Sequence, residues 1–154
     1  MIHQSSSHEQ LEAEPVILAG VAAAYGVELA PGTLQLPGGA RVDIDGVAAD
    51  LSVIVEVFSH QGRLRGGQFH KVARDALKLI TIARSHPDAR LAIAFGDRAA
   101  ADCVTGGSWL AEALRNWGVD VVVIQLDDAL RSRLTAAQAR QVMVNQPPLD
   151  DAYP

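Results

Sequence analysis

The chain has very little cysteine, few aromatic residues and no long apolar run. A single cysteine, Cys103, excludes an internal disulfide and a cysteine-rich zinc site, and such usage is typical of the reducing cytoplasm. No apolar run approaches the ~20 residues needed to cross a bilayer, so no membrane partner is expected. Aromatic residues make up only 5% of the 154 residues, and we expect a core built mainly from Val, Leu, Ile and Ala.

Positive charge is scarce and unevenly distributed. The formal net charge is −5, so the chain as a whole is not a general binder of polyanions. The only lysines are Lys71 and Lys78, and no acid occurs between Glu56 and Asp75. That acid-free segment carries four cationic residues: Arg63, Arg65, Lys71 and Arg74. It is either a solvated loop and helix start or a local basic patch that binds nucleic acid.

The alternation of helical and strand patterns predicts a single α/β domain of three layers, with a central mixed sheet flanked by helices. We expect residues 1–9 to be a disordered leader, residues 10–146 the domain, and residues 147–154 a flexible tail. The expected strands are Arg41–Asp45, Val53–Phe58, Leu91–Phe95 and Asp120–Leu126, with a short extended piece around Thr33–Leu36. The expected helices run from about Pro15 to Tyr25, over Gly67–Ser85, from Ser108 to about Trp117, and over much of Asp128–Val144.

One carboxylate occurs in an expected buried strand, where burying a charge costs free energy. Glu56 falls in the middle of the β-branched run Val53–Phe58, and a buried carboxylate needs partners. This strand and Arg41–Asp45 are expected to form a hairpin that turns near Asp50, which places Asp45 opposite Glu56 on one face. Two carboxylates this close repel each other, and a divalent cation is the usual remedy. Oxygen ligands favour Mg²⁺ or Mn²⁺, so the pattern predicts such a site at these two acids.

The helix Gly67–Ser85 carries polar residues at helical spacing. They form one stripe: Gln68, Lys71, Asp75 and Lys78. One interpretation is a solvent-facing stripe with a Lys71–Asp75 pair, which contributes only a few tenths of a kcal/mol. The other is a stripe that points into a site beside the sheet. Lys71 is then expected to serve the carboxylates, because Lys78 lies ~10 Å further along the helix.

These segments together resemble the core of the PD-(D/E)XK nuclease superfamily. The matching parts are Val42–Gly46, Val53–Val57, the glycine-rich loop that follows and the helix with Gln68 and Lys71. The resemblance covers roughly Arg41 to Phe95. It implies a restriction-endonuclease-like fold with an αβββαβ core and metal-dependent cleavage of nucleic-acid phosphodiesters.

The resemblance also assigns site residues, with two departures. Asp45 and Glu56 match the metal-binding acids, and the carbonyl of Val57 is a further ligand for Mg²⁺ or Mn²⁺. The family places a lysine two residues after the second acid, where this chain has Phe58. Lys71 from the following helix is the expected replacement. The first motif also lacks the proline that precedes its acid in the family.

The resulting hypothesis is a cytoplasmic, metal-dependent nuclease. Its catalytic residues would be Asp45, Glu56, Lys71 and Gln68, the last matching a helix glutamine that some family members place near the metal. Arg63, Arg65 and Arg74 would hold the phosphate backbone of DNA or RNA. A homodimer or a partner protein is plausible, because a lone chain with so small a basic surface would be a weak nuclease. The alternative is a catalytically inactive relative that serves as a nucleic-acid or protein-binding module.

Overall fold

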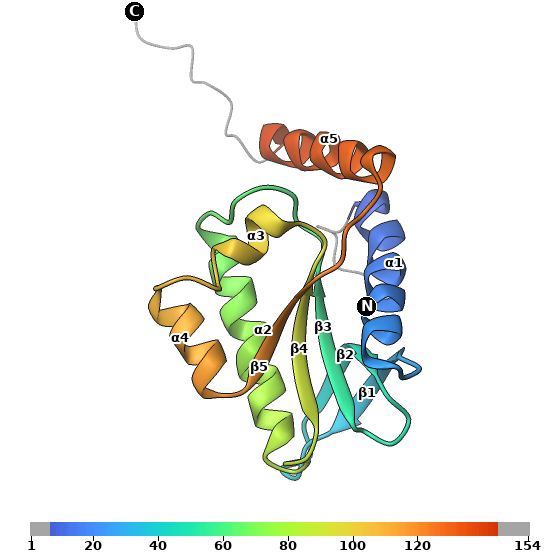
Figure 1. Ribbon diagram of the computed structural model, residues 1–154, viewed down its shortest axis with the longest axis vertical. Helices are drawn as coiled ribbons and strands as arrows, with labels where there is room; N and C mark the ends of the chain where they lie inside the picture. Colours follow the sequence, from blue (N-terminus) through green and yellow to red (C-terminus); the bar gives the residue numbers. More distant parts are fainter. Residues whose placement is uncertain (1–6, 145–154) are drawn as a thin grey trace, which may run out of the picture.

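A five-stranded mixed sheet forms the middle layer of the protein (Figure 1). The structure is a computed structural model that describes residues 7–144. The strands are β1 (Ala30–Gln35), β2 (Arg41–Val47), β3 (Val53–Phe58), β4 (Arg90–Phe95) and β5 (Val119–Val123). They lie in sequence order across the sheet. β2 pairs antiparallel with both β1 and β3, whereas β3, β4 and β5 run parallel to one another.

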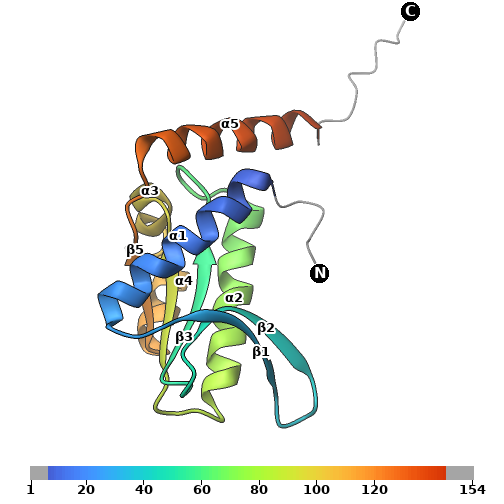
Figure 2. The ribbon, with the colours of Figure 1, turned by 90° about the vertical axis from the view of Figure 1, so that its right-hand side faces the viewer.

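Helices cover both faces of this sheet. They are α1 (His8–Tyr25), α2 (Gly67–Ala83), α3 (Arg98–Asp102), α4 (Trp109–Asn116) and α5 (Asp128–Val144). Figures 1 and 2 show α2, α3 and α4 on one side of the sheet and α1 on the other, with α5 lying across the end towards which β3 points. The predicted three-layer α/β domain with a mixed central sheet is therefore confirmed.

Strand β3 lies at the centre of the core, and all six of its residues are buried. Because successive side chains of a strand point to opposite faces, Ile54 and Phe58 pack on the α2 side, while Val55 and Val57 pack against α1 and α5. Glu56 lies between Ile54 and Phe58 at the same two-residue spacing, so it is on the same face of the strand. Its carboxylate is therefore directed to the α2 side of the sheet.

The start of α1 differs from the sequence-based prediction. The helix begins at His8 rather than near Pro15, because Ser7 and Gln10 form a capping box in which each side chain bonds the backbone N–H of the other. Ser7, His8 and Glu9, which were expected in the leader, belong to this capped start. The rest of that leader and the predicted tail lie outside the described residues.

Two strands and one short helix also differ from the prediction. The extended piece around Thr33–Leu36 is the full strand β1, paired with β2, and the short helix α3 was not predicted. Strand β5 ends at Val123 rather than at Leu126, before the chain turns into α5. No helix in the part of the chain that the structure describes is long and apolar enough to span a membrane.

Helix α1 lies very close to β2 at one point. A Cβ atom on Gly46 would collide with the side chain of Leu18, so only glycine permits this approach. Glu14 lies one helical turn before Leu18, and Asp45 directly precedes Gly46. The close packing therefore brings Glu14 into the neighbourhood of Asp45.

Candidate active site

Strands β2 and β3 separate at the position of the two predicted metal-binding acids. Their pairing is limited to Gly46–Val55 and Val47–Ile54, at the end next to the hairpin turn. Beyond it, Asp45 Oδ2 accepts a hydrogen bond from the backbone N–H of Val57 at 2.8 Å. Asp45 thus takes the place of a ladder partner and lies next to Glu56. We call the point where the strands part, with the carboxyl groups of Asp45 and Glu56, the acidic fork.

Glu56 is almost completely buried, with 3% of its surface exposed. Burial, together with the neighbouring Asp45 carboxylate, raises the pKa of Glu56 from its ordinary 4.5 to about 8, although Lys78 acts in the opposite direction. The predicted proximity of the two acids is therefore present. It leaves Glu56 holding a proton near neutral pH when no further cation is bound.

Lys78 closes the fork from the α2 side. Its Nζ donates to Glu56 Oε1 at 2.8 Å and to the carbonyl oxygen of Asp43 at 2.9 Å. One ammonium group therefore joins β2 and β3 where the ladder between them has ended. The polar stripe on α2 was predicted either to face solvent or to point into a site beside the sheet. The contacts of Lys78 with β2 and β3 support the second interpretation.

Lys71 lies elsewhere, at the carboxyl end of β3. Its Nζ is 4.8 Å from the centre of the Phe58 ring and 3.7 Å from Asp75 Oδ2. The direction of α2 explains why Lys78 contacts Glu56 instead. After the loop, α2 runs back along β3 (Figure 1), so Lys71 near its start contacts Phe58, and Lys78, about two turns later, contacts Glu56.

Carboxylates outnumber ammonium groups around the fork. Burial raises the pKa of Glu14, and the Asp45 carboxylate raises it further. Burial also raises the pKa of Asp75, with Asp45 adding to this effect and the two lysines opposing it. Glu14 was not predicted as a site residue, because its proximity depends on how α1 packs against β2. This crowding of carboxyl groups, together with burial, therefore favours their neutral, protonated forms.

The donor set of the fork suits a hard divalent cation. Asp45 and Glu56 supply oxygen ligands, and Mg²⁺ is commonly held by only one or two carboxylates while it retains several waters. Within residues 7–144, no three His, Cys, Asp or Glu side chains are grouped so that they could hold a metal ion. Val57, whose carbonyl is the third predicted ligand, contacts Asp45 through its N–H. Once Glu56 releases its proton to a bound cation, the two acids fit Mg²⁺ or Mn²⁺.

The predicted phosphate-binding residues separate into two groups. Arg63 and Arg65 lie in the loop between β3 and α2 and line a cavity of about 900 Å³, together with Lys71 and Gln68. Arg74 is exposed on α2 and is not among the residues that line it. Gln68 Oε1 accepts from the N–H of Arg65 at 2.7 Å, so this carboxamide holds the loop. We call this space the basic cavity.

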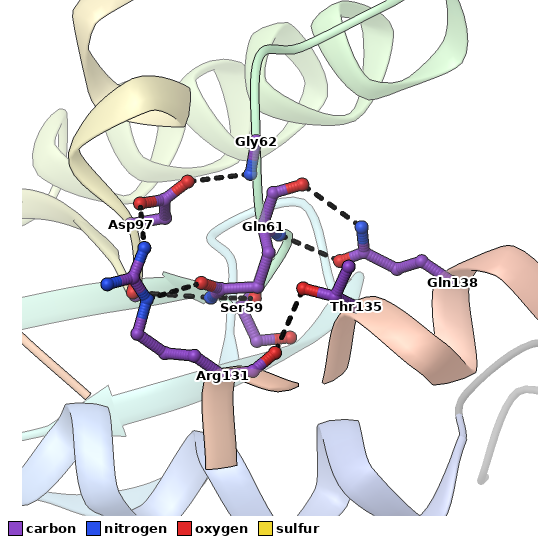
Figure 3. A network of polar contacts seen from close by, with 8 residues as sticks. Ser59, Gln61, Gly62, Asp97, Arg131, Thr135 and Gln138 are labelled. Carbon is purple, nitrogen blue, oxygen red and sulfur yellow. Dashed lines mark hydrogen bonds and ion pairs between the residues drawn. The ribbon is translucent and has the colours of Figure 1, made fainter. Parts of the chain in front are cut away.

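A polar network fixes the loop against α5 (Figure 3). Gln138 accepts from the backbone N–H of Gln61 at 2.7 Å and donates to the carbonyl of the same residue at 3.0 Å. The backbone N–H of Gly62 donates to Asp97 at 2.6 Å, and Arg131 contacts both Asp97 and the Gln61 side chain. The loop that carries Arg63 and Arg65 is therefore held on both sides.

Comparisons with protein-family models, with curated proteins and with solved structures give no match for this chain. The fork and the cavity are the two features of the described residues that point to a function. Asp45, Glu56 and Val57 are in direct contact or adjacent, and Lys78 completes this group. Lys71 and Gln68 lie at the edge of the cavity instead.

Proposed function

We propose that this protein is a divergent, metal-dependent nuclease that hydrolyses nucleic-acid phosphodiesters in the cytoplasm. One observation carries the proposal: two carboxyl groups meet at the point where β2 and β3 part, with the ammonium of Lys78 on one of them. The element order α1-β1-β2-β3-α2-β4 supports it, because the PD-(D/E)XK superfamily has the same αβββαβ order.

Each group at the fork has a role in this proposal. Asp45 and Glu56 would hold Mg²⁺ or Mn²⁺, and this ion would neutralise their charge and stabilise the charge that develops on the phosphate. Lys78 holds Glu56 in position and supplies a positive charge at the same place. Its long reach from α2 compensates for Phe58, which occupies the strand position where the family has lysine.

Cleavage assays with two acid variants test this function. The full chain with Mn²⁺ should cut single- or double-stranded DNA or RNA, and Asp45→Asn and Glu56→Gln should each abolish both cleavage and calorimetric Mn²⁺ binding. Asp43→Asn is the matched control, because its exposed carboxylate lies on the same strand and bonds Thr33. Mn²⁺ binding that survives in both acid variants would refute the metal site.

The second candidate function is a nuclease-fold module that binds nucleic acid or protein without cleaving. The direct contact between Lys78 and Glu56 favours it, because the ammonium group already occupies one oxygen of the carboxyl group that would hold the metal. This candidate predicts no cleavage with either metal on any of the four substrates.

A further inference from the structure

The basic cavity lies at the carboxyl end of β3, one of the parallel strands of the sheet. In open α/β sheets, ligands commonly bind in the crevice outside the carboxyl ends of such strands. One wall is the loop after β3 with the start of α2, and the opposite wall is the second half of α5. Helix α1 contributes Gln10. Segments far apart in the sequence therefore build this space.

The charge of the cavity wall is opposite to that of the chain. Arg63, Arg65 and Lys71 line it, and among the described residues no Asp or Glu does. The two arginines are exposed and form no ion pair with any carboxylate that the structure describes. In a protein of net charge −5, this concentration of unpaired cations selects an anionic ligand.

The neutral polar groups of the wall also favour a ligand rich in acceptor oxygens. Gln10 Oε1 accepts from the N–H of Ser7, and Gln68 Oε1 accepts from the N–H of Arg65. Because their oxygens are used in this way, these carboxamides have their Nε2 donors left for a ligand. Cations combined with N–H donors match the phosphodiester backbone.

The size of the cavity determines whether one or two strands of nucleic acid can enter it. A volume of about 900 Å³ is in the range of small-molecule sites, which holds a few nucleotides of one strand. A space of this volume is on the order of 12 Å across, and a duplex exceeds it, because its major groove alone is about 12 Å wide. The network of Gln61, Gln138 and Asp97 holds these two walls together.

From this we infer that the basic cavity binds a single strand of nucleic acid and that α5 makes the protein selective for single strands. Lys71 and Phe58 line the cavity on its side towards the fork: Phe58 lies two residues after Glu56 on β3, and Lys71 Nζ is 3.7 Å from Asp75 Oδ2. A strand seated on Arg63 and Arg65 would therefore lie at the end of β3 that follows Glu56. This assignment of the ligand rests on the proposed nuclease function.

Binding without metal tests the inference separately from cleavage. Fluorescence anisotropy with a labelled 8-nucleotide strand in chelator should show at least about tenfold tighter binding than the same sequence as a duplex. Arg63→Ala/Arg65→Ala should weaken binding of the strand about tenfold and reduce the slope of log K against log salt by about 1.4. The control is Arg84→Ala/Arg98→Ala, which removes two exposed arginines outside the cavity and should leave affinity unchanged.

A second pair of variants tests the α5 wall. Ala139→Glu places a carboxylate on the cavity lining, whereas Ala136→Glu places one on an exposed residue of the same helix that does not line it. Only Ala139→Glu should weaken binding of the strand. Equal or tighter binding of the duplex, or full affinity in the double arginine variant, would overturn the inference.

The two proposals fail in different ways. Tight, arginine-dependent binding of the strand without any cleavage in Mn²⁺ would leave the cavity assignment standing and remove the nuclease. Cleavage of a duplex that is unaffected by Arg63→Ala/Arg65→Ala would leave the nuclease standing and remove the single-strand site.

Discussion

The acidic fork and the basic cavity lie at two points of the same strand, β3, and they handle charge in opposite ways. At the fork, carboxylates are buried beside one another, and burial raises the pKa of Glu14, Glu56 and Asp75. In the cavity, Arg63 and Arg65 are exposed to solvent and have no carboxylate beside them among the described residues. The buried charges are sensitive to small changes and suit chemistry, whereas the exposed charges suit reversible binding.

The largest effect is expected from the lysine that closes the fork. Lys78→Met removes the ammonium but keeps an apolar stem, and it should lower Mn²⁺-dependent cleavage about 10²–10³-fold, the usual effect of losing one charge-stabilising donor. Lys71→Met should reduce strand binding instead and leave the turnover of bound substrate within a few fold.

Single-turnover cleavage at saturating enzyme separates these two lysine effects. Thermal unfolding of each variant controls for loss of fold. A larger loss of the cleavage step in Lys71→Met than in Lys78→Met would show that the lysine at the edge of the cavity is the one that acts at the fork.

The next largest effect is the pH dependence of stability in the metal-free protein. Glu56 keeps its proton up to about pH 8 in the folded state but loses it near 4.5 when unfolded. The folded state therefore binds more protons between these values, and stability falls as pH rises from about 4.5 to 8, by on the order of a few kcal/mol. Glu56→Gln should remove most of this slope.

Calorimetric unfolding in chelator across this pH range measures the slope. Asp43→Asn should unfold with the same pH dependence as the unchanged protein. A Glu56→Gln variant that keeps the full slope would show that other groups cause it.

A smaller effect is expected where the cavity wall is attached. Gln138→Ala removes two hydrogen bonds to the backbone of Gln61 and should lower stability by about 1–2 kcal/mol, with an accompanying loss of strand affinity. Denaturant unfolding and anisotropy measure the two effects. If affinity is retained while stability falls, the position of the loop does not depend on this contact.

The smallest effect is expected from the surface ion pairs between α1 and α5. Arg133 bonds Glu12 and Arg140 bonds Glu9, and all but the half-buried Glu9 are exposed. Such pairs are typically worth 0–1 kcal/mol, so Arg140→Ala should change stability by less than about 1 kcal/mol and leave strand binding unaltered. A larger loss than that of Gln138→Ala would reverse the ranking of the contacts that hold α5.

The sequence was most informative where neighbouring residues determine structure. The bounds of β3 were predicted correctly because a β-branched run is flanked by turn residues, and hairpin geometry then placed Asp45 beside Glu56. Prediction failed where packing between elements that are distant in the sequence determines which side chains reach the site. The choice of Lys78 over Lys71 depends on how α2 returns along β3, and the approach of Glu14 depends on the glycine that admits α1.

The start of α1 was missed for a different reason. Its capping box was readable in the sequence as Ser7 followed by Gln10, but Pro15 gave the stronger apparent start signal. The cavity had a local signal on one side only. Its basic wall was visible as an acid-free segment, whereas the opposite wall comes from residues more than sixty positions later in the chain.

Helix α5 is the last of the described elements to be synthesised, and a domain emerges from the ribosome amino end first. The fork is built from α1, β2, β3 and α2, all of which emerge earlier. The nascent protein therefore passes through a stage that has the carboxyl groups of the fork but not the α5 wall of the basic cavity. If α5 makes the protein selective for single strands, as we infer, a chain stalled before α5 would carry the chemical groups without that selectivity.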